Sequence, residues 1–267
     1  MAVDFLTKLT AAAKARGSWL CVGLDPVPDR LPNGVERTPA GIVEFCRKIV
    51  EATAGQVCAY KPNIAYFEAL GADGWPALKD VIDAIPDDIP VILDAKRGDV
   101  GHTAERYAVA YYERLGVDAV TVNPYMGQDA VRPFGTWTGK GAFVLCLTSN
   151  DSAAEIQLLK ADGVPLFLHV ARLANEWPGV CGLVVGATRA DMMAEVRKIA
   201  PKKVLLVPGV GAQGGDLERS VRLGAWPDGG GVLVSASREV LYASSGKDYA
   251  AAALAAAERL REKMRGA

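Results

Sequence analysis

Eight short runs of apolar and β-branched residues recur along the chain, and each is separated from the next by a segment that carries helix signals. The runs span residues 19–24, 57–61, 91–95, 119–123, 143–148, 183–186, 204–208 and 232–235. They are almost continuously apolar, which is typical of parallel strands buried on both faces. Eight such strands alternating with helices predict an α/β fold, a closed parallel (β/α)8 TIM barrel. An open, doubly wound sheet is the alternative.

The segments between the runs carry recognisable helix boundaries. Thr38 followed by Pro39 is typical of an N-cap and a first helical position. Thr188 and Asp191 have the spacing of a capping box directly after the sixth run. The alanine-rich segment 249–264 predicts a final helix.

The length of 267 residues suits one α/β barrel, and no linker or shift in composition divides the chain. We therefore expect a single domain over residues 1–267. The first 17 residues predict an amphipathic helix and lack the ordered regions of a signal peptide. Because no apolar stretch reaches 18 residues, we expect no membrane partner and a cytoplasmic protein.

Net charge and cysteine content indicate which partners and which cellular compartment to expect. Thirty basic and 31 acidic residues give a net charge of −1, so we expect no nucleic-acid partner. The five cysteines are odd in number and form no C-x-x-C pair, which favours buried, reduced thiols in a reducing compartment. The two histidines, His102 and His169, lack a third partner nearby in sequence, so we expect no metal site.

Polar residues follow the apolar runs, where a barrel places its active site. Those we expect to act there are Asp25, Lys61, Asp94, Lys96, Asp99, Asn123, Ser149, Gln213, Ser237 and Arg238.

The third run ends with the densest group of charges. Because side chains alternate along a strand, Asp94 and Lys96 should point to the same side. Asp99 follows shortly after, and Lys61 closes the neighbouring run, so the sequence predicts a Lys–Asp–Lys–Asp cluster. Flanking carboxylates would keep Lys96 a charged proton donor. The alternatives are a metal site, which an intervening ammonium disfavours, and a purely structural ion-pair network.

The last two runs end in residues suited to phosphate. The segment 208–215 is rich in glycine, and Ser237 with Arg238 follows the eighth run. Barrels commonly bind phosphate at these two loops, where backbone N–H groups and an arginine fork are available. A surface loop with a solvated arginine is the alternative.

Several motifs together resemble the orotidine 5′-phosphate decarboxylase family, and most closely its longer-chain bacterial type. The central one is DAKRGDVGHTAERYA at 94–108. The others, in chain order, are GLD at 23–25, YKPN at 60–63, VNPYMG at 122–127, LTSN at 147–150, PGVGAQGGD at 208–216 and SASREVLYAS at 235–244. The resemblance therefore spans nearly the whole chain.

The resemblance implies roles for the charged residues. Lys96 resembles the proton donor to C6 of the pyrimidine, and Asp94 the carboxylate placed beside the substrate carboxylate. Lys61 resembles the lysine that bridges the ribose and the charged cluster. Asp25 resembles the acceptor of a ribose hydroxyl.

The resemblance also implies how the rest of the site is built. Asp99 and Thr103 resemble residues that reach into the site of a neighbouring subunit, which implies a homodimer. Ser149 resembles the serine that reads the pyrimidine. Gln213 resembles the glutamine of the phosphate-gating loop, and Arg238 the arginine that binds the phosphate.

The implied function is decarboxylation of orotidine 5′-monophosphate (OMP) to uridine 5′-monophosphate (UMP) in de novo pyrimidine biosynthesis, without a cofactor. One alternative is a magnesium-dependent sugar-phosphate decarboxylase or aldolase of the same barrel superfamily. A Schiff base on Lys61 or Lys96 is another, although flanking carboxylates favour the charged amine, which cannot attack a carbonyl. The last alternative is a non-catalytic nucleotide-binding barrel.

Overall fold

The computed structural model describes residues 4–210 and 216–267. Within these ranges, eight parallel strands form one sheet in the order β2-β1-β10-β9-β8-β5-β4-β3. The strands are β1 (Leu20–Leu24), β2 (Ala59–Pro62), β3 (Ile92–Arg97), β4 (Ala119–Val122), β5 (Gly141–Leu147), β8 (Val180–Val185), β9 (Val204–Pro208) and β10 (Val232–Ala236). Two isolated parallel bridges, Tyr60 to Val91 and Asn63 to Asp94, join β2 to β3. The predicted (β/α)8 barrel is confirmed, and the open sheet is excluded.

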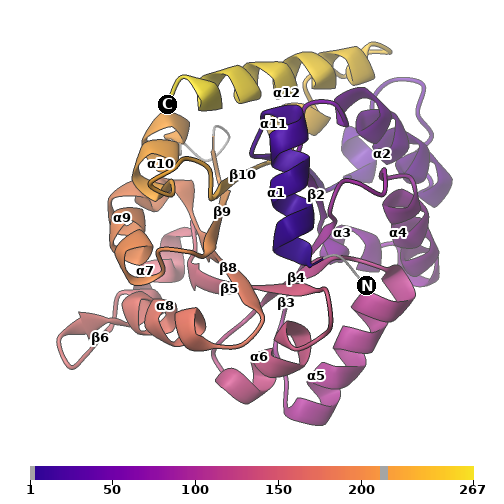
Figure 1. Cartoon of the computed structure of the whole chain (residues 1–267). Helices are drawn as coiled ribbons and strands as arrows, with labels where there is room; N and C mark the ends of the chain where they lie inside the picture. Colours follow the sequence, from indigo (N-terminus) through magenta and orange to yellow (C-terminus); the bar gives the residue numbers. More distant parts are fainter. Residues whose placement is uncertain (1–3, 211–215) are drawn as a thin grey trace.

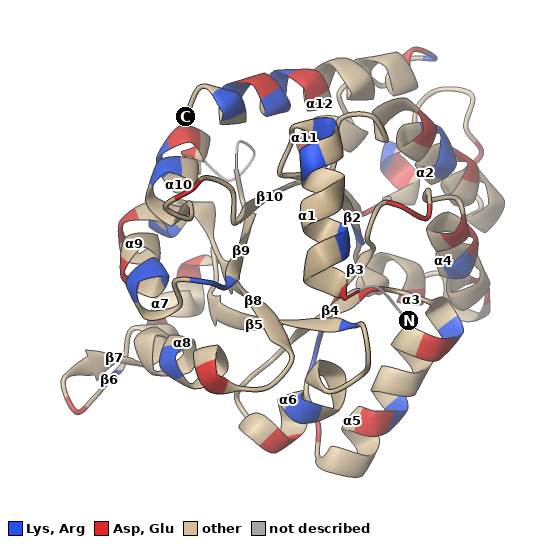
Figure 2. Cartoon of the chain, viewed as in Figure 1, with Lys and Arg blue, Asp and Glu red and all other residues tan. Residues whose placement is uncertain are grey.

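Helices surround the sheet as an outer ring (Figure 1). They are α2 (Pro39–Thr53), α3 (Ile64–Glu68), α4 (Gly74–Asp83), α5 (Gly101–Ala108), α6 (Gln128–Gly135), α7 (Ala154–Gln157), α8 (Leu166–Glu176), α9 (Ala190–Ile199), α10 (Leu217–Gly224), α11 (Arg238–Leu241) and α12 (Tyr249–Arg265). A π-helical segment, Val109–Leu115, continues α5. Basic and acidic residues are interspersed along these helices, whereas the strands are mostly uncharged (Figure 2).

The predicted N-terminal helix, α1 (Phe5–Arg16), lies across the amino ends of the strands (Figure 1). Its buried residues join a core cluster with apolar side chains of the strands, and Phe5 packs edge-on against Phe143 at 5.7 Å between ring centroids. Lys8 binds Asp118, directly before β4, at 2.9 Å. This end of the barrel is therefore closed by apolar packing, which leaves the opposite end for polar chemistry.

Of the two helix starts predicted from capping residues, one is confirmed. The hydroxyl of Thr38 accepts the N–H of Gly41 and caps α2, as predicted. The capping box at Thr188 is wrong, because a short 3-10 turn occupies Ala187–Arg189 and α9 begins after it without a side-chain cap. The carboxylate of Asp191 instead pairs with Arg219.

A small antiparallel hairpin was not predicted. It consists of β6 (Lys160–Ala161) and β7 (Val164–Pro165) and projects from the ring beside α8 (Figure 1). Asp162 and Gly163 form its turn, both with positive φ. An Asp-Gly pair is a strong hairpin signal that was present in the sequence.

None of the helices among the described residues is long and apolar enough to span a membrane.

Candidate active site

The carboxyl ends of the strands enclose a cavity of about 340 Å³. Side chains from the ends of β1, β2, β3 and β10 line it, together with backbone that follows β9. The predicted site residues among them are Asp25, Lys61, Asp94, Ser237 and Arg238. Parallel strands deliver their last residues to one end of a barrel, so residues far apart in sequence meet there. The size falls in the range of small-molecule sites.

Two lysines hold one carboxylate at this mouth. Lys61 Nζ lies 3.0 Å from Asp94 Oδ2, and Lys96 Nζ lies 2.6 Å from Asp94 Oδ1. The side chains of Lys61 and Asp94 are only 5% and 12% exposed, whereas that of Lys96 is 50% exposed. Lys96 is therefore the more exposed cation of the cluster, whereas Lys61 is the one that lines the cavity.

Burial and charge act in opposite directions on this cluster. Burial alone would lower the pKa of Lys61, but the charges of Asp94 and Asp25 outweigh it and hold that pKa above its usual value. Burial alone would raise the pKa of Asp94, but Lys61 and Lys96 hold it well below the usual range. Near neutral pH, Lys61 is therefore an ammonium and Asp94 a carboxylate.

Lys96 occupies an unusual backbone conformation. Its φ is +50°, one of two positive values at non-glycine positions among the described residues. The register between β3 and β4 slips between Leu93 and Arg97, which marks a bulge at this point. Left-handed backbone costs a non-glycine residue about 1–2 kcal/mol. Strain of this kind persists where the surroundings fix it, and it gathers at functional sites.

Asp25 follows β1 and presents an unpaired oxygen. Its Oδ1 is buried and makes no hydrogen bond within the described part of the chain. The hydroxyl of Tyr242 accepts the N–H of Val27 at 2.7 Å and donates to the carbonyl of Asp25 at 3.2 Å, which fixes the loop. A buried unpaired acceptor costs about 1–3 kcal/mol, so a hydroxyl donated by a ligand would relieve that cost.

The end of β10 contacts β1 closely. A Cβ added to Gly23 would lie 1.9 Å from Ser237 Oγ, so any larger residue would force the serine side chain to move. Arg238 comes next and begins α11 at the rim of the cavity. Its fork is suited to an oxyanion.

The remaining predicted residues lie outside the ion cluster. Asp99 Oδ1 accepts the N–H of Val100 at 2.7 Å, and Thr103 lies in the first turn of α5. Asn123 Oδ1 accepts the N–H of Tyr125 and shapes the loop after β4.

The other two predicted residues follow β5 and β9. Ser149 lies beyond the end of β5, where its backbone passes close to Gly186. Gln213 lies outside the described residues. The structure thus brings together Lys61, Asp94 and Lys96 from the predicted cluster, but not Asp99 of the same chain.

The sequence did not single out Tyr66, Ser235 and Glu239, which line the cavity. It also missed two residues that fix the site without lining its cavity. One is Tyr242, which fixes the loop after β1. The other is Thr121, whose hydroxyl donates to Asp94 Oδ1 at 3.0 Å. A threonine inside the otherwise apolar strand AVTV was the available signal for the second.

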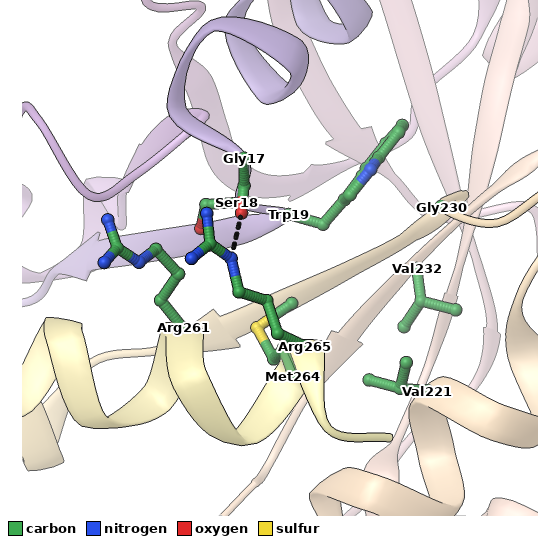
Figure 3. A pocket seen from close by; sticks show the side chains of 9 residues that line it. All are labelled: Gly17, Ser18, Trp19, Val221, Gly230, Val232, Arg261, Met264 and Arg265. Carbon is green, nitrogen blue, oxygen red and sulfur yellow. Dashed lines mark hydrogen bonds between the residues drawn. The ribbon is translucent and has the colours of Figure 1, made fainter.

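A second pocket, of about 120 Å³, lies at the opposite end of the barrel, where α1 and α12 terminate (Figure 3). Arg261 and Arg265 point toward it, but both pair with Glu262, and Arg265 Nε also donates to the carbonyl of Gly17. None of the described residues that line this pocket is acidic, so it lacks the lysine–carboxylate arrangement of the first.

Other chemistries find little support within residues 4–210 and 216–267. No group of three or more possible metal ligands occurs among them. All five cysteines are buried, as predicted, and burial raises the pKa of the Cys21 thiol to about 12. His169 Nε2 lies 3.0 Å from the carbonyl oxygen of Ala161, on the hairpin. The lysine–carboxylate cluster is the group of charged side chains that lies beside the larger cavity.

Comparison with known proteins gives one consistent result. Residues 18–254 match the family described as Orotidine 5'-phosphate decarboxylase / HUMPS family. The orotidine 5'-phosphate decarboxylase of Azoarcus sp. (strain BH72) is 52% identical over 264 residues, which cover 97% of this chain and 98% of that protein. The enzyme of the same description from Roseiflexus sp. (strain RS-1) is 49% identical over 269 residues, which cover 99% and 98%.

Solved structures agree with this result. The structure of Leishmania donovani OMP decarboxylase aligns with a TM-score of 0.88 at 40% identity, covering 99% of this chain and 98% of that one. The inhibitor complex of the Methanocaldococcus jannaschii decarboxylase aligns with a TM-score of 0.68 at 19% identity, which speaks for the fold alone.

Proposed function

The chain belongs to the orotidine 5'-phosphate decarboxylase / HUMPS family, and on this premise we propose that it converts OMP to UMP and carbon dioxide without a cofactor. This is a carboxy-lyase reaction of de novo pyrimidine biosynthesis. The observation that carries the proposal is the Lys61–Asp94–Lys96 cluster at the mouth of the barrel.

In the proposed step, the bond between C6 of the pyrimidine and its carboxylate breaks, and the electron pair stays on C6. Carbon dioxide leaves, and the Lys96 ammonium gives one proton to C6. The amine then regains a proton from water. A positive charge already in place where negative charge develops needs no reorganisation during the reaction, which is the basis of electrostatic catalysis.

Asp94 acts on the ground state. Its carboxylate would lie beside the substrate carboxylate, and their repulsion would vanish as carbon dioxide leaves. Two unit charges 4 Å apart interact by about 4 kcal/mol at an effective dielectric constant near 20. That energy corresponds to roughly three powers of ten in rate, so stabilisation of the carbanion and binding of the rest of the substrate must supply the remainder.

The remainder of the nucleotide would be held by the strand ends around the cluster. The unpaired Oδ1 of Asp25 would accept a ribose hydroxyl, and Arg238 would bind the phosphate beside Ser237. Lys61 would contact the ribose.

The residues outside the cluster complete this substrate site. Ser149 would read the pyrimidine, Asn123 would line the site, and Gln213 would close over the phosphate.

We propose a homodimer, in which Asp99 and Thr103 of each subunit complete the site of the other. Among the described residues, the ion pairs of Lys61 and Lys96 involve Asp94 and not Asp99. Three exposed apolar side chains lie in the same region, on the loops after β3 and β4: Val100, Tyr125 and Met126, which are 46%, 85% and 48% exposed. An apolar surface next to the active site would be covered in a dimer.

The other readings gain no support. The named relatives align as orotidine 5'-phosphate decarboxylases over nearly the whole chain, which does not favour a sugar-phosphate aldolase. Lys61 stays charged, which disfavours a Schiff base. We propose that residues 1–267 form a single barrel domain. The buried thiols suit a reducing compartment, so we also propose that the protein works in the cytoplasm.

The test is turnover of OMP by the purified chain in excess EDTA, followed by the change in ultraviolet absorbance and by release of carbon dioxide. We expect conversion to UMP at a rate that EDTA does not change. Loss of activity with EDTA and recovery with magnesium would support the sugar-phosphate alternative. Binding of UMP without any turnover would support a regulatory barrel.

A further inference from the structure

Thr121 is a polar residue in a buried strand, and its hydroxyl contacts the ion cluster. It lies in the body of β4, is 1% exposed, and is flanked by the buried Val120 and Val122. A valine would fill the same space. Packing alone therefore does not explain why this position carries a hydroxyl group.

That hydroxyl forms hydrogen bonds with three consecutive residues of β3. It accepts the N–H of Ala95 at 3.0 Å and the N–H of Lys96 at 2.9 Å. It donates to Asp94 Oδ1 at 3.0 Å. A hydroxyl has two acceptor positions and one proton, so these three bonds use all of them. Because ionised Asp94 can only accept, the direction of the third bond is fixed.

The bulge in β3 explains why a side chain is needed there. Leu93 pairs with Val120 and Arg97 pairs with Val122, so β3 advances by four residues while β4 advances by two. Between these two pairs, β3 therefore has two more residues than β4. Lys96 adopts its positive φ within this segment. The Thr121 hydroxyl provides an acceptor for the N–H groups of the displaced residues, which buried backbone requires.

We propose that Thr121 is a positioning residue for decarboxylation: its hydroxyl holds the Lys96 backbone in the left-handed conformation and orients the Asp94 carboxylate. The inference rests on the proposed function and deepens it. Thr121 does not face the cavity as a lining residue. It acts on the reaction only through Asp94 and Lys96, so its loss should disturb the chemical step and spare substrate binding.

The test compares three variants with the wild type: Thr121→Val, which keeps the shape, Thr121→Ser, which keeps the hydroxyl, and the control Thr53→Val. Thr53 is a fully buried threonine of α2. Its hydroxyl donates to the carbonyl of Ile49 and lies 2.7 Å from the hydroxyl of Tyr60, and neither contact involves Asp94 or Lys96. For each protein, kcat and KM for OMP and the Kd for UMP are measured, with the melting temperature.

We expect Thr121→Val to lower kcat by about 10- to 100-fold, because displacement of reacting groups by a fraction of an ångström has effects of this size. KM and the Kd for UMP should stay within about threefold, which is under 1 kcal/mol of binding. Thr121→Ser and Thr53→Val should keep kcat within about threefold of the wild type.

A folded Thr121→Val protein with wild-type kcat would overturn the proposal, and so would a Thr121→Ser protein as impaired as Thr121→Val. If Thr121→Val does not fold, Thr121→Cys decides, because a thiol is a weak hydrogen-bonding group. Its kcat should fall below that of Thr121→Ser, and equal values would overturn the proposal. Absence of turnover by the wild type would instead refute the proposed function itself.

Discussion

Among single residues, Asp94 joins three partners of the site. It accepts hydrogen bonds from Lys61, Lys96 and Thr121, while its own side chain is 12% exposed. Removing one member of a buried charge cluster leaves the others unpaired, which is far more costly than the cluster's net contribution to stability. Substitutions at Asp94 should therefore change both the chemistry and the fold's stability.

The first prediction concerns catalysis. Asp94→Asn keeps the size of the side chain but removes the charge that would repel the substrate carboxylate. We expect kcat to fall by about 10²- to 10³-fold, from the interaction of two charges near 4 Å, and KM to rise much less. Steady-state kinetics with OMP measure both values. A variant with kcat close to that of the wild type would remove Asp94 from the mechanism.

The second prediction concerns stability and pH. The pKa of Asp94 lies below its unfolded value, so its ion pairs contribute fully above about pH 4 and are lost as the pH falls further. We expect Asp94→Asn to lower the free energy of unfolding by about 3 kcal/mol at pH 7, because Lys61 loses its buried partner. Urea unfolding should show that difference unchanged from about pH 5 to 8 and shrinking below about pH 4. A difference that grew on acidification would contradict this assignment.

At the scale of elements, the carboxyl end of β3 shows what sequence could and could not predict. Strand alternation correctly predicted that Asp94 and Lys96 would meet, and their charged atoms lie 2.6 Å apart. The backbone that brings them together is not a regular strand, because Lys96 lies in a bulge and has a positive φ. The pattern of hydrophobic residues predicts which strands are buried. A bulge depends on the register between two neighbouring strands, and the hydrophobic pattern of one strand carries no information about that register.

Other elements show the same limit. The eight strands and the capped start of α2 follow from local pattern and were predicted. The capping box at Thr188 fails, because Asp191 pairs across to Arg219 on α10. The role of Thr121 depends on its neighbour β3, so only the polar residue itself could be noticed in the sequence.

The third prediction tests the contact between β1 and β10. Gly23→Ala would place a methyl group 1.9 Å from Ser237 Oγ and 3.3 Å from Asp25 Oδ2. We expect the displaced β10 end to raise KM for OMP about tenfold or more, with a smaller effect on kcat, because small displacements weaken oriented contacts. Gly55→Ala is the matched control, since no atom lies within 4 Å of the added carbon. Equal kinetics for the two variants would show that the close approach is not needed.

At the scale of the whole molecule, the two ends of the barrel are specialised. Apolar residues of α1 close the amino end, while the carboxyl end carries the charged cluster and the cavity. Stability and chemistry are thus separated along the barrel axis, as is usual in this architecture. Asp99 and Thr103 follow β3 at the same carboxyl end and lie outside the cluster.

The fourth prediction tests the shared site. If Asp99 acts in the partner subunit, Lys96→Ala and Asp99→Asn impair complementary halves of a site. After unfolding and refolding as a 1:1 mixture, half of the dimers are mixed and each has one intact site, so about one quarter of the wild-type activity should return. The two variants refolded separately are the control. A mixture no more active than its components would contradict a shared site, and a monomer in sedimentation would exclude it.

The most direct test of the central claim is the rate of OMP decarboxylation by Lys96→Ala in excess EDTA, compared with the wild type, with UMP affinity measured for both. We expect rapid turnover by the wild type and a kcat lowered at least about 10⁴-fold in the variant, since proton donation and charge stabilisation are lost together. UMP binding should persist, because Asp25, Ser237 and Arg238 still line the cavity. A variant that decarboxylates OMP within tenfold of the wild-type rate would contradict the account.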